Sequence, residues 1–284
     1  MKRLSLLLIL CIFLPSLACA QVVANAADVL LPGVITELHD GDLIDLDADG
    51  VAEQIRYGVR EQEESGVWEY RLVVGQTQLD GEGIYLTGRL HALRTDSNAQ
   101  EVLLFLSDYG WSDDDTSYVY SYCGGSFRYL GVIPAMPWEL RFTEEGMLSG
   151  SVRASILHTW FRPADFVLCT AYSDEDFSTR ISHIAEMPRD LYPMGVEVTV
   201  LRDLPLVVSR TNPAHALTIK AGERALIVAT DDIEWLYIVP TEVDWSASEY
   251  GAGWLHTEIG GYSAVIDGET VDTQALFDGL FYAD

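Results

Sequence analysis

The sequence predicts an all-β protein, with a propeller-like or curved β-sheet domain over residues 22–190 and a small β-barrel over residues 191–260. Three observations support this fold class. Short segments rich in Val, Leu, Tyr and Phe recur along the chain, and the turn signals Asp80-Gly81, Cys123-Gly124-Gly125 and Glu145-Gly146 separate them. No convincing helical pattern interrupts residues 22–190. With 49% hydrophobic residues, the 284-residue chain can bury the cores of two domains.

Residues 1–20 have the pattern of an export signal. Lys2-Arg3 precede a mostly apolar run over residues 4–14, which is shorter than the roughly 20 residues of a membrane span. Ala18-Cys19-Ala20 then offers a cleavage site. A lipid anchor on Cys19 is an alternative, although Ser16 stands where a lipobox usually has leucine. We expect a secreted or cell-envelope protein whose mature chain has no transmembrane span.

The chain is strongly acidic, with a formal net charge of −27. Such a charge disfavours binding to nucleic acid and to anionic membrane surfaces, because both would be repelled. It is compatible with divalent cations, with a cationic partner, or simply with high solubility.

One acidic segment, residues 45–53, has the spacing of a cation-binding loop. Its acids fall at relative positions 1, 3, 5 and 9, Gly50 at position 6 supplies a sharp bend, and the carbonyl of Val51 adds an oxygen. A bound Ca²⁺ would relieve the mutual repulsion of the carboxylates. The expected metal ligands are Asp45, Asp47, Asp49, Val51 and Glu53. A solvated acidic turn is the alternative, since Asp-Gly turns are common.

The loop differs from an EF-hand, because Arg56 occupies position 12 and residues 54–59 alternate like a strand. A calcium loop that leads into a strand resembles the FG-GAP/VCBS repeats of integrin-like propellers, although Glu53 stands where that family usually has aspartate. A weak period supports the resemblance: a shift of 48 residues places Asn98 over Gly50 and Glu101 over Glu53, and a second shift reaches Glu145-Gly146.

Eight strands are expected in the first domain, and two segments of it resemble secreted Gram-positive proteins with degenerate VCBS-like repeats. These segments are 120–131 and 150–161. Cys123 stands where such hairpins usually carry aspartate, which leaves a Cys123–Cys169 disulfide and two free thiols as alternatives. The expected strands are Tyr70–Val74, Gly83–Leu93, Glu101–Leu106, Ser117–Tyr122, Phe127–Ile133, Trp138–Phe142, Leu148–Phe161 and Phe166–Tyr172.

A proline- and glycine-containing segment, residues 187–195, is expected to link the domains. Residues 191–260 then resemble a bacterial SH3 (SH3b) domain, with a hairpin around Lys220-Ala221-Gly222-Glu223 and strands that begin near Trp235 and Trp254. We expect both tryptophans to be core residues. An insert over residues 242–252 departs from that family and carries the two expected ligand-binding residues, Trp245 and Tyr250.

Residues 261–284 are expected to form a docking tail, with one short helix over 272–277. The sequence contains no HExxH motif, G-x-S-x-G elbow or phosphate-binding loop. The resemblances therefore imply a non-enzymatic, calcium-stabilised binding or scaffold protein of the cell envelope, whose SH3b-like module binds a cell-wall component or an extracellular protein. The alternative is a cell-wall hydrolase, or another envelope enzyme, with an unrecognised active site.

Overall fold

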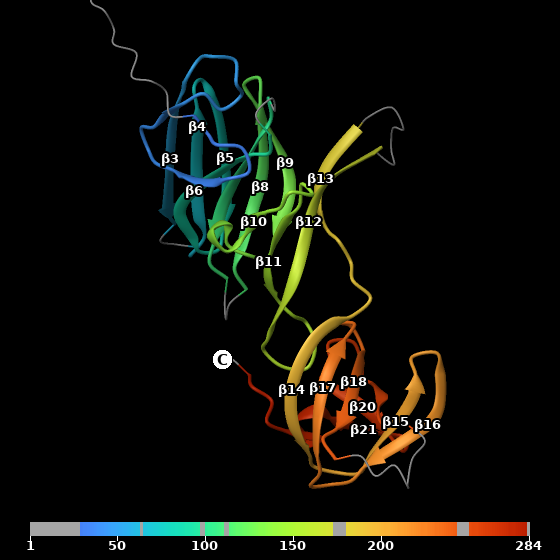
Figure 1. Cartoon of the computed structure of the whole chain (residues 1–284). Helices are drawn as coiled ribbons and strands as arrows, with labels where there is room; N and C mark the ends of the chain where they lie inside the picture. The colour runs from blue at the N-terminus through green and yellow to red at the C-terminus, as the bar shows by residue number, and fades with distance from the viewer. Residues whose placement is uncertain are drawn as a thin grey trace, which may run out of the picture.

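Strands dominate the described part of the chain in the computed structural model (Figure 1). The structure describes residues 29–62, 65–96, 100–110, 114–172, 180–242 and 250–282. Two 3₁₀-helices, η1 (Pro137–Glu139) and η2 (Thr273–Ala275), are the helical elements among these residues. The predicted all-β fold with curved sheets is confirmed. Among the same residues, no helix has the length and apolar character needed to cross a bilayer.

Three antiparallel sheets form the first part of the molecule. The first has the order β2 (Leu43–Ile44), β3 (Glu53–Glu61), β4 (Trp68–Val74) and β5 (Thr77–Gly83). The second has the order β1 (Ile35–Leu38), β6 (Leu86–Arg94), β7 (Val102–Asp108), β8 (Thr116–Cys123) and β9 (Ser126–Ile133). The third has the order β10 (Arg141–Phe142), β11 (Leu148–Arg153), β12 (Phe161–Tyr172) and β13 (Arg180–Glu186).

The second sheet is covered on both faces, and its strand β7 shows why. Every residue of β7 is buried. Leu104 and Leu106 pack in the core shared with the first sheet, whereas Leu103 and Phe105 pack in the core shared with the third. A strand buried on both faces needs an unbroken apolar run rather than an alternating one, which explains the sequence VLLFLS.

Corresponding strands of the three sheets begin at nearly constant intervals along the chain. The strands that follow β2, β6 and β10 are β3, β7 and β11, which begin at Glu53, Val102 and Leu148. These starts lie close to the 48-residue spacing seen in the sequence. Of the segments that lead into these three strands, the one before β3 carries the acids spaced as in a cation-binding loop, Asp45, Asp47, Asp49 and Glu53.

One predicted turn and several predicted strands need correction. Asp80-Gly81, expected to form a turn, lies inside β5, where a Cβ on Gly81 would come within 2.2 Å of the Tyr70 hydroxyl. Residues 138–142 form the end of η1 and the short strand β10, because Pro137 starts a helical turn. The expected strand 148–161 breaks after Arg153, and 166–172 is the second half of the longer β12.

A seven-stranded antiparallel sheet and a separate hairpin form the second part of the molecule. Strand β14 curls around one side of this unit (Figure 1). The hairpin pairs β20 (Ser263–Ile266) with β21 (Glu269–Asp272). The sheet has the order β16 (Asn212–Ile219), β15 (Leu204–Ser209), β19 (Gly253–His256), β18 (Trp235–Pro240), β17 (Arg224–Thr230), β14 (Tyr192–Val200) and β22 (Phe277–Asp278).

The C-terminal segment is integrated into this unit. Strand β22 pairs with β14, and Phe277 is buried in the core. The expected helix over residues 272–277 is reduced to the three-residue η2, whose cap is the Asp272 carboxylate accepting from the Gln274 N–H. Phe281 remains exposed, so the expected burial of the tail holds for part of it.

The β11–β12 loop, residues 154–160, joins the two parts of the molecule. Its residues Ile156, Leu157 and Trp160 belong to the hydrophobic core of the second part. Its backbone also bonds to the C-terminal segment, with Leu157 N–H donating to the Gly260 carbonyl and Thr159 N–H to the Phe281 carbonyl. This excursion explains why the chain leaves the strand after Arg153.

Candidate metal-binding loop

The acidic loop, residues 45–52, connects two paired strands. β2 and β3 are antiparallel neighbours, with Ile44 opposite Glu53, so both ends of the loop are held together. Ala48 and Gly50 have positive φ angles of 57° and 88°, which turn the chain sharply enough to bring alternate side chains to one side. The predicted bend at Gly50 is therefore present.

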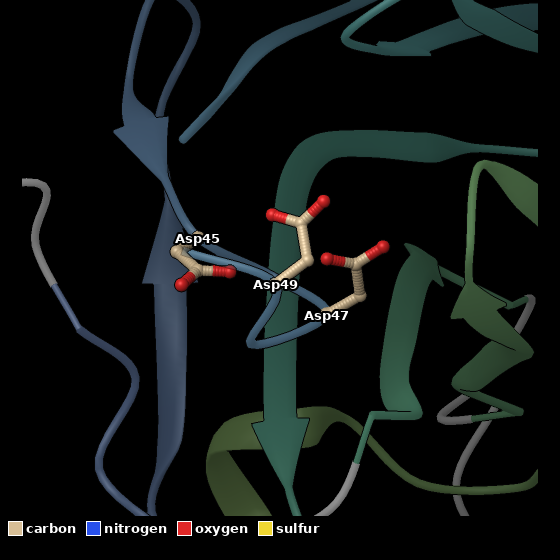
Figure 2. A group of neighbouring side chains, drawn as sticks. All are labelled: Asp45, Asp47 and Asp49. Carbon is tan, nitrogen blue, oxygen red and sulfur yellow. The ribbon is translucent and has the colours of Figure 1, made fainter. Parts of the chain in front are cut away.

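Three of the predicted acids converge. Asp45, Asp47 and Asp49 each offer a carboxylate oxygen, and these oxygens all lie within 4.8 Å of one another (Figure 2). Oxygens bound at about 2.3–2.6 Å from a single Ca²⁺ lie at most about 5 Å apart. The separation therefore fits one shared cation.

Hydrogen bonds fix one oxygen of each aspartate. Gly50 N–H donates to Asp45 Oδ2 at 3.0 Å, and Val51 N–H donates to Asp49 Oδ1 at 2.7 Å. Gly124 N–H, in the β8–β9 turn, donates to Asp47 Oδ2 at 3.2 Å. These bonds orient the carboxylates before any ion binds.

Two of the remaining oxygens have no protein partner. Asp45 Oδ1 and Asp47 Oδ1 are buried, and neither forms a hydrogen bond within the described chain. Asp47 as a whole is only 8% exposed. A buried carboxylate oxygen without a partner is strongly unfavourable, because it loses its hydration and gains nothing in exchange. A cation bound at this cluster would supply the missing interaction.

Glu53 uses one carboxylate oxygen for a hydrogen bond within the loop, and the Val51 carbonyl stays a predicted ligand. Glu53 Oε2 accepts from the Leu46 N–H at 2.9 Å and closes the neck of the loop, outside the three-aspartate cluster. Burial raises the pKa of Glu53 above its usual value, the Leu46 N–H opposes this shift, and the charges of Asp47 and Asp49 add to it. The Val51 side chain is exposed, and its N–H serves Asp49.

Residues from the second sheet complete the surroundings. Arg94, buried at the end of β6, donates through Nη2 to the carbonyls of Asp45 and Leu46 rather than to the carboxylates. Burial, together with the nearby negative charges of Glu53 and Asp47, raises the pKa of Tyr122 to about 12. Neither Arg94 nor Gly124 was expected here, because no local sequence signal connects them to the loop.

The other predictions about side chains concern aromatic residues in the second part of the molecule. Trp245 is outside the described residues, and Tyr250 is 41% exposed. Trp235 and Trp254, expected in the core, are half-buried and contact His256 and Tyr237, with ring centroids 4.5 and 5.0 Å apart. They are therefore surface aromatics on neighbouring strands.

Cys123 and Cys169 are free thiols in this structure, so the disulfide alternative is not realised. Cys123 is exposed in the β8–β9 turn, and Cys169 lies within β12. The export signal and Cys19 lie outside the described residues.

Comparison of the chain with protein-family models, with curated proteins and with solved structures finds no match.

Proposed function

We propose that the loop over residues 45–53 binds one Ca²⁺ and that the ion stabilises the first part of the protein. The observation that supports this most is the pair of buried, unpartnered oxygens on Asp45 and Asp47 beside a third carboxylate, that of Asp49. The available ligands are oxygens, which hard cations prefer. Calcium tolerates irregular oxygen shells better than magnesium, which demands near-octahedral geometry.

The ion would act across two sheets. Asp47 already accepts from Gly124 in the β8–β9 turn, and the Thr77 hydroxyl at the start of β5 donates to the Gly125 carbonyl of the same turn at 2.7 Å. Neutralising the aspartates would strengthen this contact, because the repulsion that drives the loop open is removed. The role of calcium is therefore structural.

For the whole chain, we propose a non-enzymatic binding or scaffold protein of the cell envelope. The apparent export signal, the acidic composition and the resemblance to secreted VCBS-like and SH3b proteins support this proposal. The SH3b-like part would bind a cell-wall component or an extracellular protein, with Trp245 and Tyr250 as ligand contacts. Cosedimentation of the mature protein with purified cell wall, compared with a Trp245→Ala/Tyr250→Ala variant, tests this role. Equal cosedimentation of both would contradict the assigned contacts.

Thermal unfolding with calcium or with a chelator tests the metal assignment. Calcium should raise the melting temperature of the wild-type protein, and Asp47→Ala should abolish the rise. Glu144→Ala is a matched control, because Glu144 is an exposed acid far from the loop in sequence. Identical melting curves for the wild type in both conditions would refute the proposal.

A further inference from the structure

A pocket of about 490 Å³ lies between strands β1 and β6 and the η1–β10 segment, away from the acidic loop. Its volume is within the usual range of small-molecule sites, about 300–1,000 Å³. All of its lining residues belong to the described chain. Charged and aromatic side chains meet in it: Glu37, Arg89, His91, Trp138, Arg141 and Phe142.

One wall of the pocket is held rigidly by interactions among its own side chains. Arg89 donates through Nε and Nη2 to the two oxygens of Glu37, at 2.8 Å each. The same guanidinium lies over the Trp138 ring, 4.2 Å from its centroid. His91 is 3% exposed, and its ring centroid is 5.5 Å from that of Trp138. These contacts fix the wall before any ligand arrives.

Arg141 also lines the pocket, but its side chain has no such partner. It is exposed, and its guanidinium forms neither a hydrogen bond nor an ion pair within the described chain, although its charge acts on Glu145 and Asp165. By contrast, nine arginines of the described chain form ion pairs with carboxylates. In a protein with 44 acidic and 17 basic residues, an arginine left unpaired beside a pocket is notable.

The charges of the lining favour an anion. Arg89 and Arg141 carry two positive charges and Glu37 one negative charge, while burial lowers the pKa of His91 to about 4 and keeps it neutral at pH 7. The lining residues thus carry a net charge of +1 on a molecule of net charge −27, and the acids Glu145 and Asp165 interact with Arg141 from outside the lining. A planar guanidinium binds a carboxylate through two parallel hydrogen bonds. Trp138, Phe142 and Pro137 supply apolar surface beside it.

We propose that this pocket binds a small organic carboxylate whose ring or other apolar body rests on Trp138 and Phe142 and whose carboxylate pairs with Arg141. A monoanion suits the pocket, because it matches the net charge of +1 on the lining residues. The Arg89–Glu37 pair positions Trp138 and does not take part in binding the carboxylate. This site is independent of the proposed calcium loop.

Isothermal titration of the mature protein with phenylacetate and with glucuronate tests the proposal, with phenylacetamide and methyl glucoside as the neutral counterparts. At least one acid should bind with a Kd of about 1 mM or tighter, as expected for about ten non-hydrogen atoms. Its neutral counterpart should bind at least about tenfold more weakly, because the charge-assisted bond is lost. Binding of phenylacetate would indicate a ligand with an aromatic ring, and binding of glucuronate would indicate a ligand with a sugar ring.

Arg141→Gln should weaken the binding acid about tenfold without changing the neutral counterpart. Arg141 is exposed, so this variant should fold normally. Arg128→Gln is the matched control, since Arg128 is also exposed and has only a long hydrogen bond to Ser182, at 3.4 Å. Absence of binding by both acids, equal binding of acid and neutral compound, or equal effects of the two substitutions would each overturn the proposal.

Discussion

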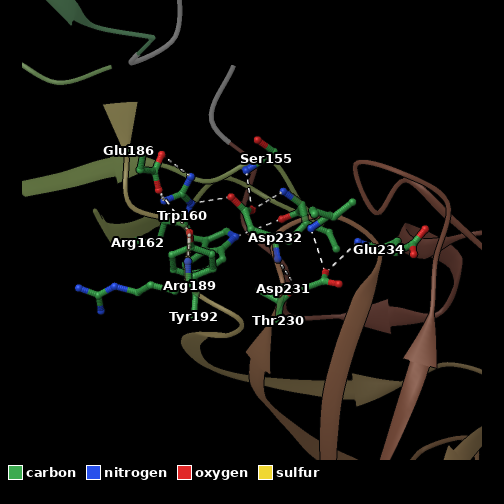
Figure 3. Close-up of polar contacts among 12 residues, drawn as sticks. Ser155, Trp160, Arg162, Glu186, Arg189, Tyr192, Thr230, Asp231, Asp232 and Glu234 are labelled. Atoms are coloured by element: carbon green, nitrogen blue, oxygen red, sulfur yellow. Dashed lines mark hydrogen bonds and ion pairs between the residues drawn. The ribbon is translucent and has the colours of Figure 1, made fainter. Parts of the chain in front are cut away.

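Two buried aspartates, Asp47 in the acidic loop and Asp232 at the junction of the two parts, are handled in opposite ways. Asp232 is 8% exposed, as is Asp47. At Asp232, Oδ1 accepts from the N–H groups of Ser155 and Ile156, and Oδ2 accepts from Arg162 Nε at 2.6 Å (Figure 3). Among the described residues, Asp47 has one backbone donor to one oxygen and no donor to the other. The protein's own groups satisfy the first carboxylate, whereas we propose that an external cation satisfies the second.

The surroundings of Asp232 extend this difference. Arg162 also pairs with Glu186 and lies over the Tyr192 ring, 4.3 Å from its centroid. The network therefore connects the β11–β12 loop, β12, β13, β14 and the segment after β17. At the junction, the charge of Arg162 and the N–H groups of Ser155 and Ile156 satisfy Asp232 and connect the two parts. Two equally buried carboxylates can therefore serve different purposes: one with protein partners for both oxygens is structural, and one with an unpartnered oxygen is a candidate ion ligand.

The largest predicted effect is at the junction. Asp232→Ala leaves Arg162 with one fewer anion and two N–H groups without acceptors, and removing one partner of a buried pair typically costs about 3–5 kcal/mol. We expect this loss of unfolding free energy in urea titrations, with calcium or with chelator alike. Asp203→Ala, which breaks the exposed pair with Lys220, should cost far less, because solvent screens such surface pairs. A loss that depends on calcium would break the comparison.

The second prediction concerns His91, a buried group without a countercharge in hydrogen-bonding contact. Burial lowers its pKa from 6.5 to about 4, the charges of Arg89 and His39 lower it further, and Glu37 opposes the shift. Its Nδ1 has no hydrogen-bond partner within the described chain. The unfolded chain therefore binds a proton below pH 6.5 that the folded chain refuses until about pH 4.

Stability should accordingly be highest above pH 6.5 and should fall as the pH drops toward 4, by about 3 kcal/mol from this residue. Urea titrations across this range measure the loss. His91→Phe should flatten this part of the profile, whereas His39→Phe, at an exposed residue, should leave it unchanged. An unaltered slope in His91→Phe would show that another group causes the acid sensitivity.

The effect of Asp47→Asn on the free energy of unfolding should depend on whether calcium is present. In chelator, the substitution removes a charge that nothing neutralises, so stability should stay constant or rise. With calcium at 100 times the Kd, the wild type should gain about 2.7 kcal/mol, and the variant should lose that gain. Chemical denaturation of both proteins in both media provides the measurement. A loss of equal size in both media would make Asp47 a structural residue like Asp232.

The smallest predicted effect tests the bend of the loop. Gly50→Ala meets no atom within 4 Å, so its cost comes only from the positive φ of 88° and should be about 1 kcal/mol. Gly58→Ala, in β3, also meets no atom within 4 Å and has no positive φ, so it serves as the control. Equal stability of the two variants would show that the loop relaxes to another conformation.

The sequence predicts the cluster of aspartates in the acidic loop but not the network around Asp232, for a physical reason. The three aspartates are near neighbours in the chain, and their spacing together with Gly50 determines that they converge. Arg94 bonds to Leu46 across 48 residues, and Asp232 bonds to Ser155 across 77. Such contacts depend on how distant elements pack, so no local pattern reveals them.

The same distinction explains the strand predictions. The continuous apolar run of β7 predicts a buried strand, and the structure buries it on both faces. Asp80-Gly81 predicts a turn, whereas Gly81 is needed inside β5 to leave room for the Tyr70 ring of β4, a contact that no local pattern reveals. The aromatic and apolar residues 138–142 predict a strand, but Pro137 starts a helical turn there instead.

Calcium titration of the mature protein by calorimetry, after removal of bound metal, tests the central claim most directly. We predict one ion per chain, with a Kd of about 10⁻⁴–10⁻³ M or tighter. Asp47→Asn should abolish binding, and Asp203→Asn, at an exposed ion pair, should preserve it. Absence of binding in the wild-type protein, or equal binding by the Asp47→Asn variant, would contradict the account.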